Sequence, residues 1–343
     1  MRAAVGEPTA RDELRLAIDE WTRRSGHAAV TGLSLRRSNY ATSAAVLNVH
    51  VTLGDGRRLR MVYKRTDPDA LIPAARGVKA LFLHDPEREI WVYQNILAGD
   101  CDLAAPALYA SGGNSSGRRW LLLERVPGIE LAQVGDRRVW CAVAAWLGRL
   151  HARNESRVQA LPAGAPVRWS DPAFQLRWAQ RAERFMTRSA AEGNGLLAAL
   201  APLWPQYPAV AESLAALPAT IVHGDFNASN VMVSRDSGAV EIRAIDWEMA
   251  GIGPGLIDLA ALVSGGWSDA ERAAMVAAYR SALGDSQIGR MDDAAFASSL
   301  DLCRLALAVQ WLGWSPNWAP PPRHAHGWGL EALQLARRLR LLG

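Results

Sequence analysis

Lysine is nearly absent from this chain of 343 residues, because only Lys64 and Lys79 among its 38 basic residues are lysine. Arginine fills every other basic position, and these arginines are dispersed along the sequence. With a formal net charge of only +4, the chain has no basic stripe of the kind that binds nucleic acid, so we expect no nucleic-acid partner. Where arginine is the default, a lysine inside a predicted strand needs a specific explanation.

Cysteine is also scarce, and the three cysteines, Cys101, Cys141 and Cys303, lie far apart in largely apolar sequence. Their spacing excludes a disulfide framework and a C-x-x-C metal site. We expect all three to pack in the core.

Long hydrophobic runs are absent as well, since runs such as residues 305–309 are far shorter than the roughly 18 residues of a membrane span. Residues 1–16 carry charges where a signal peptide needs an apolar core. We therefore expect a cytoplasmic protein with no membrane partner. Half of the residues are nevertheless hydrophobic, which is enough for a sizeable core in one large or two medium domains. No pattern indicates the oligomeric state.

The hydrophobic pattern predicts a small antiparallel sheet in the first part of the chain. The expected elements there are a helix at 11–21, strands at 30–35, 44–53 and 59–63, a helix at 86–97 and a strand at 120–124. A Pro-Gly turn follows the last strand and indicates a linker.

Beyond the linker the chain is expected to be mainly helical. Helices are predicted at 139–151, 175–188, 196–204, 209–217, 269–283, 292–313 and 329–342. Pro205, Pro208 and Pro218 are expected to separate helices. Glycines in the segment 251–255 predict a tight bend, and residues 315–327 predict an extended proline-rich loop.

One polar loop stands between two buried strands, in the sequence IVHGDFNASNVMV at 221–233. Asp225 can accept a proton or a hydrogen bond from a nucleophile, and Asn230 offers a neutral oxygen that a hard cation such as Mg²⁺ accepts. Asp246, in AIDWE at 244–248, follows a second apolar run that a hairpin would return beside 231–233. The alternative is a polar loop of caps and turns without catalysis.

HGDFNASN followed by IDWE resembles the signature of the aminoglycoside phosphotransferase family, which is similar to choline kinases and, more distantly, to protein kinases. The resemblance implies an α+β, two-lobed, protein-kinase-like fold, with a small antiparallel sheet and a helix in the N-terminal lobe and a larger, mainly helical C-terminal lobe. The lobes would comprise residues 1–123 and 131–343, joined by a hinge at 124–130. It also implies ATP and Mg²⁺ as cofactors, with Asp225 as catalytic base and Asn230 and Asp246 as metal ligands.

The same resemblance assigns residues to the nucleotide, which is expected in the cleft under the small sheet. Lys64 would meet the α and β phosphates, held by Glu89; the alternatives are a solvated lysine at a strand end and Glu87 as the partner. Ser38, Asn39 and Ser43 lie where the phosphates would be covered, although an ordinary polar turn explains them equally well, and no G-x-G-x-x-G is present.

The hinge and the catalytic loop carry the remaining assignments. The backbone of Glu124 and Val126 would contact adenine. We expect His223 to brace the catalytic loop through a side-chain hydrogen bond. Asp258 either braces the same loop or compensates the dipole at a helix start. His324 and the nearby His326 have no third ligand close in sequence, which favours ordinary loop residues over a metal site.

The predicted activity is the transfer of the γ-phosphate of ATP to a hydroxyl of a small molecule, such as an antibiotic, a sugar-bearing metabolite or an amino alcohol. Antibiotic resistance, biosynthesis and primary metabolism stay open as biological roles. A protein kinase is disfavoured because HGD replaces HRD, IDW replaces DFG and no A-P-E follows. A nucleotide-binding pseudokinase is disfavoured because every group that the chemistry needs is present.

The acceptor is expected to be weakly charged. Residues 151–222 carry five acids against seven arginines, and residues 251–343 carry eight against eight, so neither segment has the carboxylate surplus that a polycation needs. The C-terminal sequence instead contains five tryptophans, at positions 267, 311, 314, 318 and 328. Core packing is one explanation for them, and an aromatic acceptor pocket is the other.

Overall fold

The structure is a computed structural model that describes residues 10–38, 44, 46–76, 79–98, 104–115, 117–161, 169–191, 195–234, 240–314 and 327–342. The chain divides into two compact units. Unit 1 consists of residues 1–77, 81–90 and 106–126, and unit 2 of residues 78–80, 91–105 and 127–343. The chain leaves unit 1 for the last time after Val126, within the segment that we interpret as a hinge.

Unit 1 is built on a five-stranded antiparallel sheet with the strand order β1-β2-β3-β5-β4. Its strands are β1 (Val30–Arg37), β2 (Val46–Leu53), β3 (Arg58–Arg65), β4 (Leu108–Gly113) and β5 (Arg119–Glu124). Helix α1 (Ala10–Arg24) precedes the sheet, and α2 (Pro73–Arg76) and the start of α3 (Arg88–Asn95) follow β3. Buried residues alternate with partly buried residues along much of β2 and β3, so one face of the sheet is turned inward.

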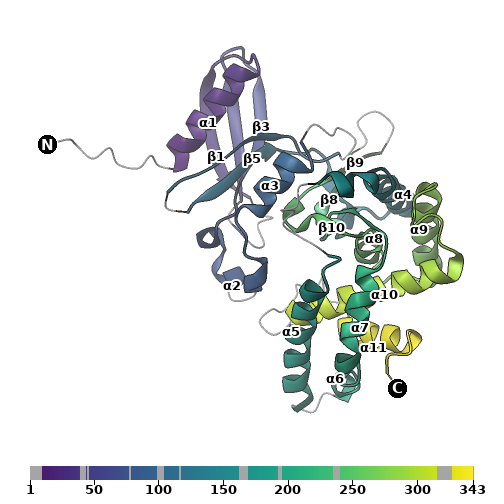
Figure 1. Ribbon diagram of the computed structural model, residues 1–343. Helices are drawn as coiled ribbons and strands as arrows, with labels where there is room; N and C mark the ends of the chain where they lie inside the picture. Colours follow the sequence, from purple (N-terminus) through teal and green to yellow (C-terminus); the bar gives the residue numbers. More distant parts are fainter. Residues whose placement is uncertain are drawn as a thin grey trace. The chain divides into compact units, whose positions relative to one another are not determined.

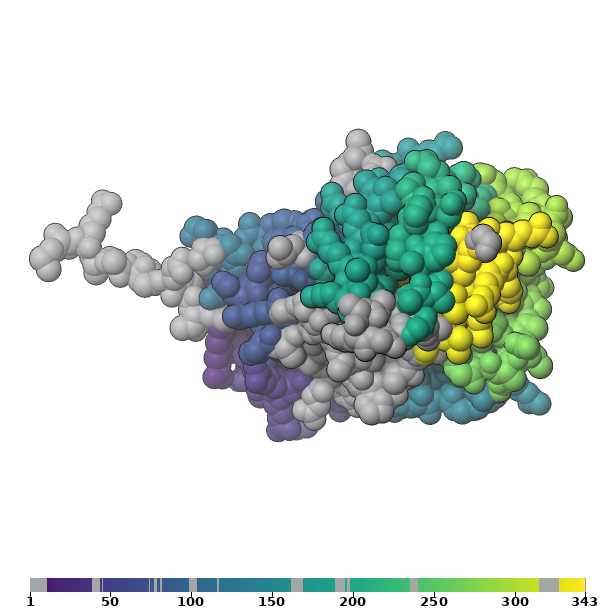
Figure 2. All heavy atoms as spheres, turned by 90° about the horizontal axis from the view of Figure 1, so that it is seen from below, coloured from purple at the N-terminus to yellow at the C-terminus, as the bar shows by residue number. Residues whose placement is uncertain are grey.

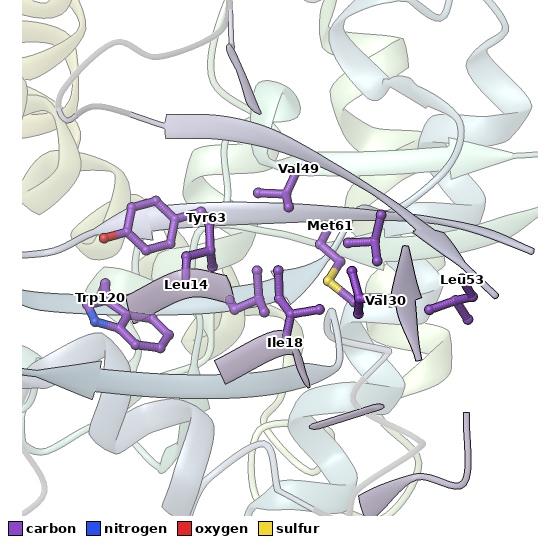
Figure 3. Packing of buried hydrophobic residues seen from close by; sticks show 10 residues of the cluster. Leu14, Ile18, Val30, Val49, Leu53, Met61, Tyr63 and Trp120 are labelled. Atoms are coloured by element: carbon purple, nitrogen blue, oxygen red, sulfur yellow. The ribbon is translucent and has the colours of Figure 1, made fainter. Parts of the chain in front are cut away.

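The core of unit 1 lies between this sheet and α1 (Figure 3). Leu14 and Ile18, four residues apart on one face of the helix, are at most 1% exposed and pack with Val49 and Met61 of the sheet. Trp120 of β5 closes one end of the cluster. This packing fixes the position of β3, the strand that carries Lys64.

Unit 2 contains most of the helices and two small sheets (Figure 1). Its helices are α4 (Arg137–Asn154), α5 (Pro172–Ala191), α6 (Gly195–Ala198), α7 (Leu203–Ala215), α8 (Leu256–Leu262), α9 (Asp269–Ala282), α10 (Asp293–Trp314) and α11 (Trp328–Arg338). Its strands are β6 (Ile129–Glu130), β7 (Ala219–Val222), β8 (Val231–Ser234), β9 (Glu241–Ala244) and β10 (Gly251–Pro254). One sheet has the order β6-β8-β9, and the other pairs β7 with β10.

Helix α10 is the central helix of the C-terminal part of unit 2. It packs against α5, α8 and α11, and Figure 2 shows the yellow α11 beside the teal helices of residues 172–215. Among the described residues, α10 is long and apolar enough to cross a membrane by length and composition alone. Because 56% of its most apolar window is buried inside the structure, this helix is weak evidence for a membrane span.

The bounds of two predicted helices in unit 2 are wrong. The helices expected at 196–204 and 209–217 are instead the short α6 and the longer α7. Pro205 lies in the first turn of α7, where its missing N–H would be unpaired in any case, and Pro208 is accommodated inside the helix.

The glycine-rich segment 251–255 is not a tight bend, because residues 251–254 form β10, which pairs with β7. Its glycines permit close packing. A Cβ at Gly255 would lie 2.7 Å from Nδ1 of His151. The glycine pattern therefore reflects neighbours that are distant in sequence.

The predicted α+β class, with a small antiparallel sheet and a helix followed by a larger, mainly helical part, is confirmed by units 1 and 2.

Candidate functional site

The loop that carries Asp225 is held by one buried carboxylate. This loop runs from β7 to β8, and the backbone N–H groups of His223 and Gly224 donate to Asp258 over 2.7 and 2.8 Å. Asp258 is fully buried in the first turn of α8. Of the two roles that the sequence leaves open for Asp258, bracing of the loop is confirmed by these bonds, and its place in the first turn of α8 also suits compensation of the helix dipole.

A buried histidine and tyrosine hold Asp258 in turn. Nε2 of His151 lies 3.2 Å from Oδ2 of Asp258, and Nδ1 lies 2.8 Å from the hydroxyl of Tyr279. Since the carboxylate can only accept, Nε2 carries the proton and Nδ1 accepts from Tyr279. The network thereby connects α4, α9 and α8 to the Asp225 loop.

Gly224 gives the loop its sharp turn. Its φ is +78°, a left-handed conformation that favours glycine, and an added Cβ would lie 2.6 Å from Nε1 of Trp169. That indole nitrogen already donates to the carbonyl of Met249 over 3.0 Å. A side chain at this position therefore has neither the backbone freedom nor the space that it needs.

We expect Gly224→Ala to lower the free energy of unfolding by roughly 2–4 kcal/mol, because strain at positive φ adds to the clash with Trp169. Urea unfolding followed by fluorescence measures this change. Gly135→Ala is the matched control, since a Cβ at Gly135 meets nothing within 4 Å. Equal stability of the two variants would contradict this explanation of Gly224.

His223 braces the loop as predicted. Its Nε2 donates to the carbonyl of Ile245 over 2.9 Å, and its Nδ1 accepts from the backbone N–H of Asp225 at 3.3 Å. These two bonds require the tautomer with the proton on Nε2. They tie the Asp225 loop to the segment that precedes Asp246.

The carboxylate of Asp225 is oriented by two side-chain amides. Nδ2 of Asn227 donates to Oδ1 over 2.5 Å, and Nδ2 of Asn230 donates to Oδ2 over 2.9 Å. Burial, together with the negative charges of Asp246 and Glu248, raises the pKa of Asp225 to about 7. The hydrogen bond from Asn230 opposes this rise without cancelling it. Asp225 can therefore take up a proton near neutral pH.

Strand pairing brings Asn230 and Asp246 together. In the register of β8 and β9, Val231 is opposite Ala244, and the N–H of Ile245 donates to the carbonyl of Asn230 over 2.9 Å. Asp246 follows in a left-handed conformation with φ 63° and ψ 62°. The predicted hairpin thus places Asp225, Asn230 and Asp246 in one site within unit 2.

Lys64 and Glu89 form an ion pair within unit 1. Nζ of Lys64 lies 2.7 Å from Oε2 of Glu89, and the side chains are 12% and 2% exposed. Lys64 comes from β3 and Glu89 from the first turn of α3, whereas Glu87 pairs with Arg119. The choice of Glu89 over Glu87 as the partner of Lys64 is confirmed.

The other predicted nucleotide residues are only partly described. Ser38 follows β1 and its N–H donates to the carbonyl of Val46 over 2.9 Å, while Asn39 and Ser43 lie outside the described residues. Glu124 ends β5, and its Oε2 accepts from the N–H of Ala107 over 3.1 Å, so its side chain secures the strand end. Val126 is half-buried at the end of unit 1.

The sequence matches the model of the phosphotransferase enzyme family, abbreviated APH, over residues 42–294. The chain therefore belongs to the phosphotransferase enzyme family. The resemblance seen in HGDFNASN and IDWE is confirmed, and so is the predicted class of enzyme, a phosphotransferase.

Solved structures of kinases share the fold of this phosphotransferase at low sequence identity. A candidate aminoglycoside phosphotransferase from Ralstonia eutropha is 19% identical with a TM-score of 0.57, covering 95% of this chain and 96% of its own. Choline kinase from Cryptosporidium parvum is 12% identical with a TM-score of 0.54, and the match covers 90% of this chain and 88% of the choline kinase. Amicoumacin kinase, solved with AMP-PNP, Ca²⁺ and amicoumacin, is 14% identical with a TM-score of 0.52, and the match covers 96% of this chain and 95% of that kinase. No curated protein sequence matches the chain.

The donor atoms in the Asp225 site fit a hard divalent cation. Because Nδ2 of Asn230 donates to Asp225, its amide oxygen is the atom available as a ligand, next to the carboxylate of Asp246. The negative charges of Asp246, Glu248 and Asp258 all raise the pKa of Asp225. A bound cation would offset that excess of negative charge.

The described tryptophans of the C-terminal sequence all pack against other rings. Trp267 contacts Trp140, Trp314 contacts Trp178, and Trp311 stacks on Trp328 with ring centroids 5.4 Å apart. This packing favours the structural explanation for these four residues. Trp318 and the loop around it, with both of its histidines, lie outside the described residues.

Sequence reasoning missed two features of the phosphotransferase site. The sequence pattern does not indicate the role of Asn227, although an amide two residues after Asp225 is in reach of its carboxylate. The rarity of lysine draws attention to Lys79 but does not predict its partner, and in the structure both carboxylate oxygens of Glu248 accept from its ammonium group.

Proposed function

We propose that this phosphotransferase transfers the γ-phosphoryl group of ATP to a hydroxyl group of a small molecule in the presence of Mg²⁺. The observation that carries the proposal is the environment of the Asp225 carboxylate. Two side-chain amides orient this carboxylate, and burial together with the nearby charge of Asp246 raises its pKa to about 7. A carboxylate held in this way can orient an acceptor hydroxyl and take its proton at Oδ, as the bond from the hydroxyl oxygen to the γ-phosphorus forms and the bond from the γ-phosphorus to the leaving ADP breaks.

The other residues act by position and charge. Asn230 and Asp246 would hold Mg²⁺, which neutralises negative charge on the phosphates of ATP when bound. Lys64, kept in place by Glu89, would contact the phosphates through its compact ammonium group. Phosphoryl transfer has a loose transition state, so such a site works mainly by alignment and neutralisation of charge. The backbone of Glu124 and Val126 is proposed to contact adenine.

We expect Lys64→Arg to lower kcat/KM for ATP by roughly 10- to 100-fold although the charge is kept. The planar guanidinium can still pair with Glu89, so the variant should fold, but it cannot occupy the place of a point charge among phosphate oxygens. Steady-state kinetics measures the loss, and a melting temperature close to that of the wild type shows that the fold is intact. Near-normal kinetics would mean that Lys64 does not contact the phosphates.

We propose further that the acceptor is a weakly charged hydroxylated molecule, such as a sugar-bearing or macrocyclic metabolite. The support is the balance of charges, with eight acids against eight arginines in residues 251–343. We expect neutral macrolides and sugars to give higher kcat/KM than polyamines of the kanamycin type, because a polycation needs surplus carboxylates. A clear preference for the polyamines would show that locally placed carboxylates override this balance.

A panel assay tests the proposed function. Purified protein is incubated with ATP, Mg²⁺ and single hydroxylated metabolites or antibiotics, and the release of ADP is recorded. We expect release to depend on one class of small molecule. ADP release that requires a protein substrate would favour a protein kinase, and nucleotide binding without release across the panel would favour a pseudokinase.

A further inference from the structure

Helix α5 carries four arginines along one side, which we call the basic face: Arg177, Arg181, Arg184 and Arg188. Spacings of three and four residues place them next to one another on the helix surface. The acid within the helix, Glu183, lies roughly 130° away around the helix axis. Adjacent like charges destabilise a helix, so the basic face needs an explanation that local structure does not supply. It has no part in the function proposed above.

Arg181 is the member of the basic face that tertiary packing fixes. Its Nε donates to the carbonyl of Gly313, near the end of α10, over 3.1 Å. A Cβ at Gly313 would lie 3.0 Å from the ring of Trp178 and 3.4 Å from Cβ of Arg181, so α5 and α10 approach closely here. This close approach leaves Arg181 half-buried, with its guanidinium held by a neutral acceptor.

The charge of Arg181 is not neutralised within the described part of the chain. Burial and the positive charge of Arg184 both lower the pKa of Arg181, and no carboxylate of the described residues opposes them. Lys64, Arg65 and Arg304 are also partly buried, and each of these three pairs with a carboxylate. A partly desolvated cation beside a second cation is unfavourable without a counter-charge. An anion bound between Arg181 and Arg184 would neutralise both.

The basic face lies on a helix that begins beside the Asp225 loop. Trp169, three residues before α5, donates its backbone N–H to the carbonyl of Ile252 over 2.7 Å, and its indole ring lies beside Gly224. From there α5 leads away from the small sheets of unit 2 (Figure 1). At about 1.5 Å per residue, Arg181 lies about 14 Å along the axis from the first residue of the helix. Arginine side chains are long, so a small molecule that carries a hydroxyl and a second functional group can span most of this distance.

We propose that Arg181 and Arg184 bind an anionic group of the acceptor, a carboxylate or a phosphate, on the same molecule as the hydroxyl that Asp225 orients. Guanidinium groups bind both kinds of anion through paired hydrogen bonds. The inference rests on the proposed function and deepens it, because it gives the weakly charged acceptor a negative charge. Arg181 and Arg184 would then determine the specificity for the acceptor.

The first experiment measures the binding of inorganic phosphate to the full chain by calorimetry, with AMP-PNP and Mg²⁺ present to fill the nucleotide site. Arg181→Gln removes the half-buried charge, and Arg184→Glu reverses an exposed one. Arg149→Gln, at an exposed position of α4, is the matched control. We expect Arg181→Gln and Arg184→Glu to bind phosphate roughly tenfold more weakly than the wild type, because each loses charge-assisted hydrogen bonds. The control should bind phosphate as the wild type does.

Melting temperatures establish that each variant is folded. Because Arg184 is exposed, Arg184→Glu is expected to fold even if the loss of the half-buried Arg181 destabilises α5. The result for Arg184→Glu then decides the question by itself.

The second experiment compares acceptors that differ in one acidic group. Glucose is paired with glucose 6-phosphate, and glucitol with gluconate, and kcat/KM is determined for each from the release of ADP. We expect the acidic member of a pair to exceed the neutral member by roughly tenfold, and the pair that shows this distinguishes a phosphate site from a carboxylate site. In Arg184→Glu, a higher KM for the acidic member should remove the preference.

Three results would overturn the inference. Arg184→Glu could bind phosphate as tightly as the wild type, or the neutral members could be the better acceptors. Phosphate binding could also depend on both arginines while acidic and neutral acceptors react equally well, which would assign the basic face to an acidic partner protein. If AMP-PNP does not bind or no acceptor releases ADP, the proposed function fails instead, and a phosphate titration without nucleotide still decides whether Arg181 and Arg184 bind an anion.

Discussion

Replacing Asp225 with asparagine is expected to lower kcat by a factor of roughly 10² to 10⁴, while the protein stays folded and still binds ATP. The amide keeps the shape of the side chain and removes its ability to take a proton. Steady-state kinetics and nucleotide binding by calorimetry measure the two effects. Asp285→Asn makes the same chemical change on an exposed aspartate of unit 2 and is the matched control. Substantial activity in Asp225→Asn would remove Asp225 from the role of base.

The same variant should be more stable than the wild type above neutral pH when metal and nucleotide are absent. Burial and nearby carboxylates raise the pKa of Asp225 from 3.8 to about 7. Between pH 3.8 and about 7, the folded state therefore keeps a proton on Asp225 that the unfolded state has released. The wild type therefore loses stability as pH rises from about 4 to about 7 and stays at the lower value above that. Asp225 is partly exposed to solvent, which weakens the effect of its surroundings. We therefore expect the free energies of unfolding of the variant and the wild type to differ by about 2 kcal/mol at pH 8, and this difference should shrink as the pH falls.

Replacing Asp246 with asparagine should remove most of the Mg²⁺ dependence of nucleotide binding, because the cation would lose its anionic ligand. We expect Mg²⁺·ATP to bind at least about tenfold more weakly, which is about 1.4 kcal/mol. Calorimetric titrations with and without Mg²⁺ measure the change, again with Asp285→Asn as control. Unchanged affinity for Mg²⁺·ATP would contradict the assignment of Asp246 as a metal ligand.

The grouping of Asp225, Asn230 and Asp246 could be predicted because it depends on a short range of sequence. Two apolar runs joined by a turn predict a hairpin, and the hairpin register carries Asp246 to Asn230. The pair of Lys64 and Glu89 could also be predicted from nearby sequence, since Lys64 lies on the strand β3 and Glu89 lies 25 residues later on the helix α3.

Other features depend on neighbours that sequence patterns do not contain. Lys79 and Glu248 are 169 residues apart, and only the folded chain brings them together. The glycines of 251–255 suggest a bend by composition, whereas Trp169 and His151 are the groups that make small residues necessary there. In the same way, Pro205 and Pro208 suggest helix ends, but tertiary packing retains α7 around them.

The most direct measurement follows the transferred group itself. Wild-type protein and Asp225→Asn are incubated with ATP, Mg²⁺ and an acceptor that stimulates ADP release, and the products are identified by phosphorus NMR and mass spectrometry. We predict a phosphate ester on a hydroxyl of the acceptor, formed in the same amount as ADP by the wild type and not above background by Asp225→Asn. ADP without phosphorylated acceptor, or equal product from both proteins, would contradict a small-molecule phosphotransferase that uses Asp225 as its base.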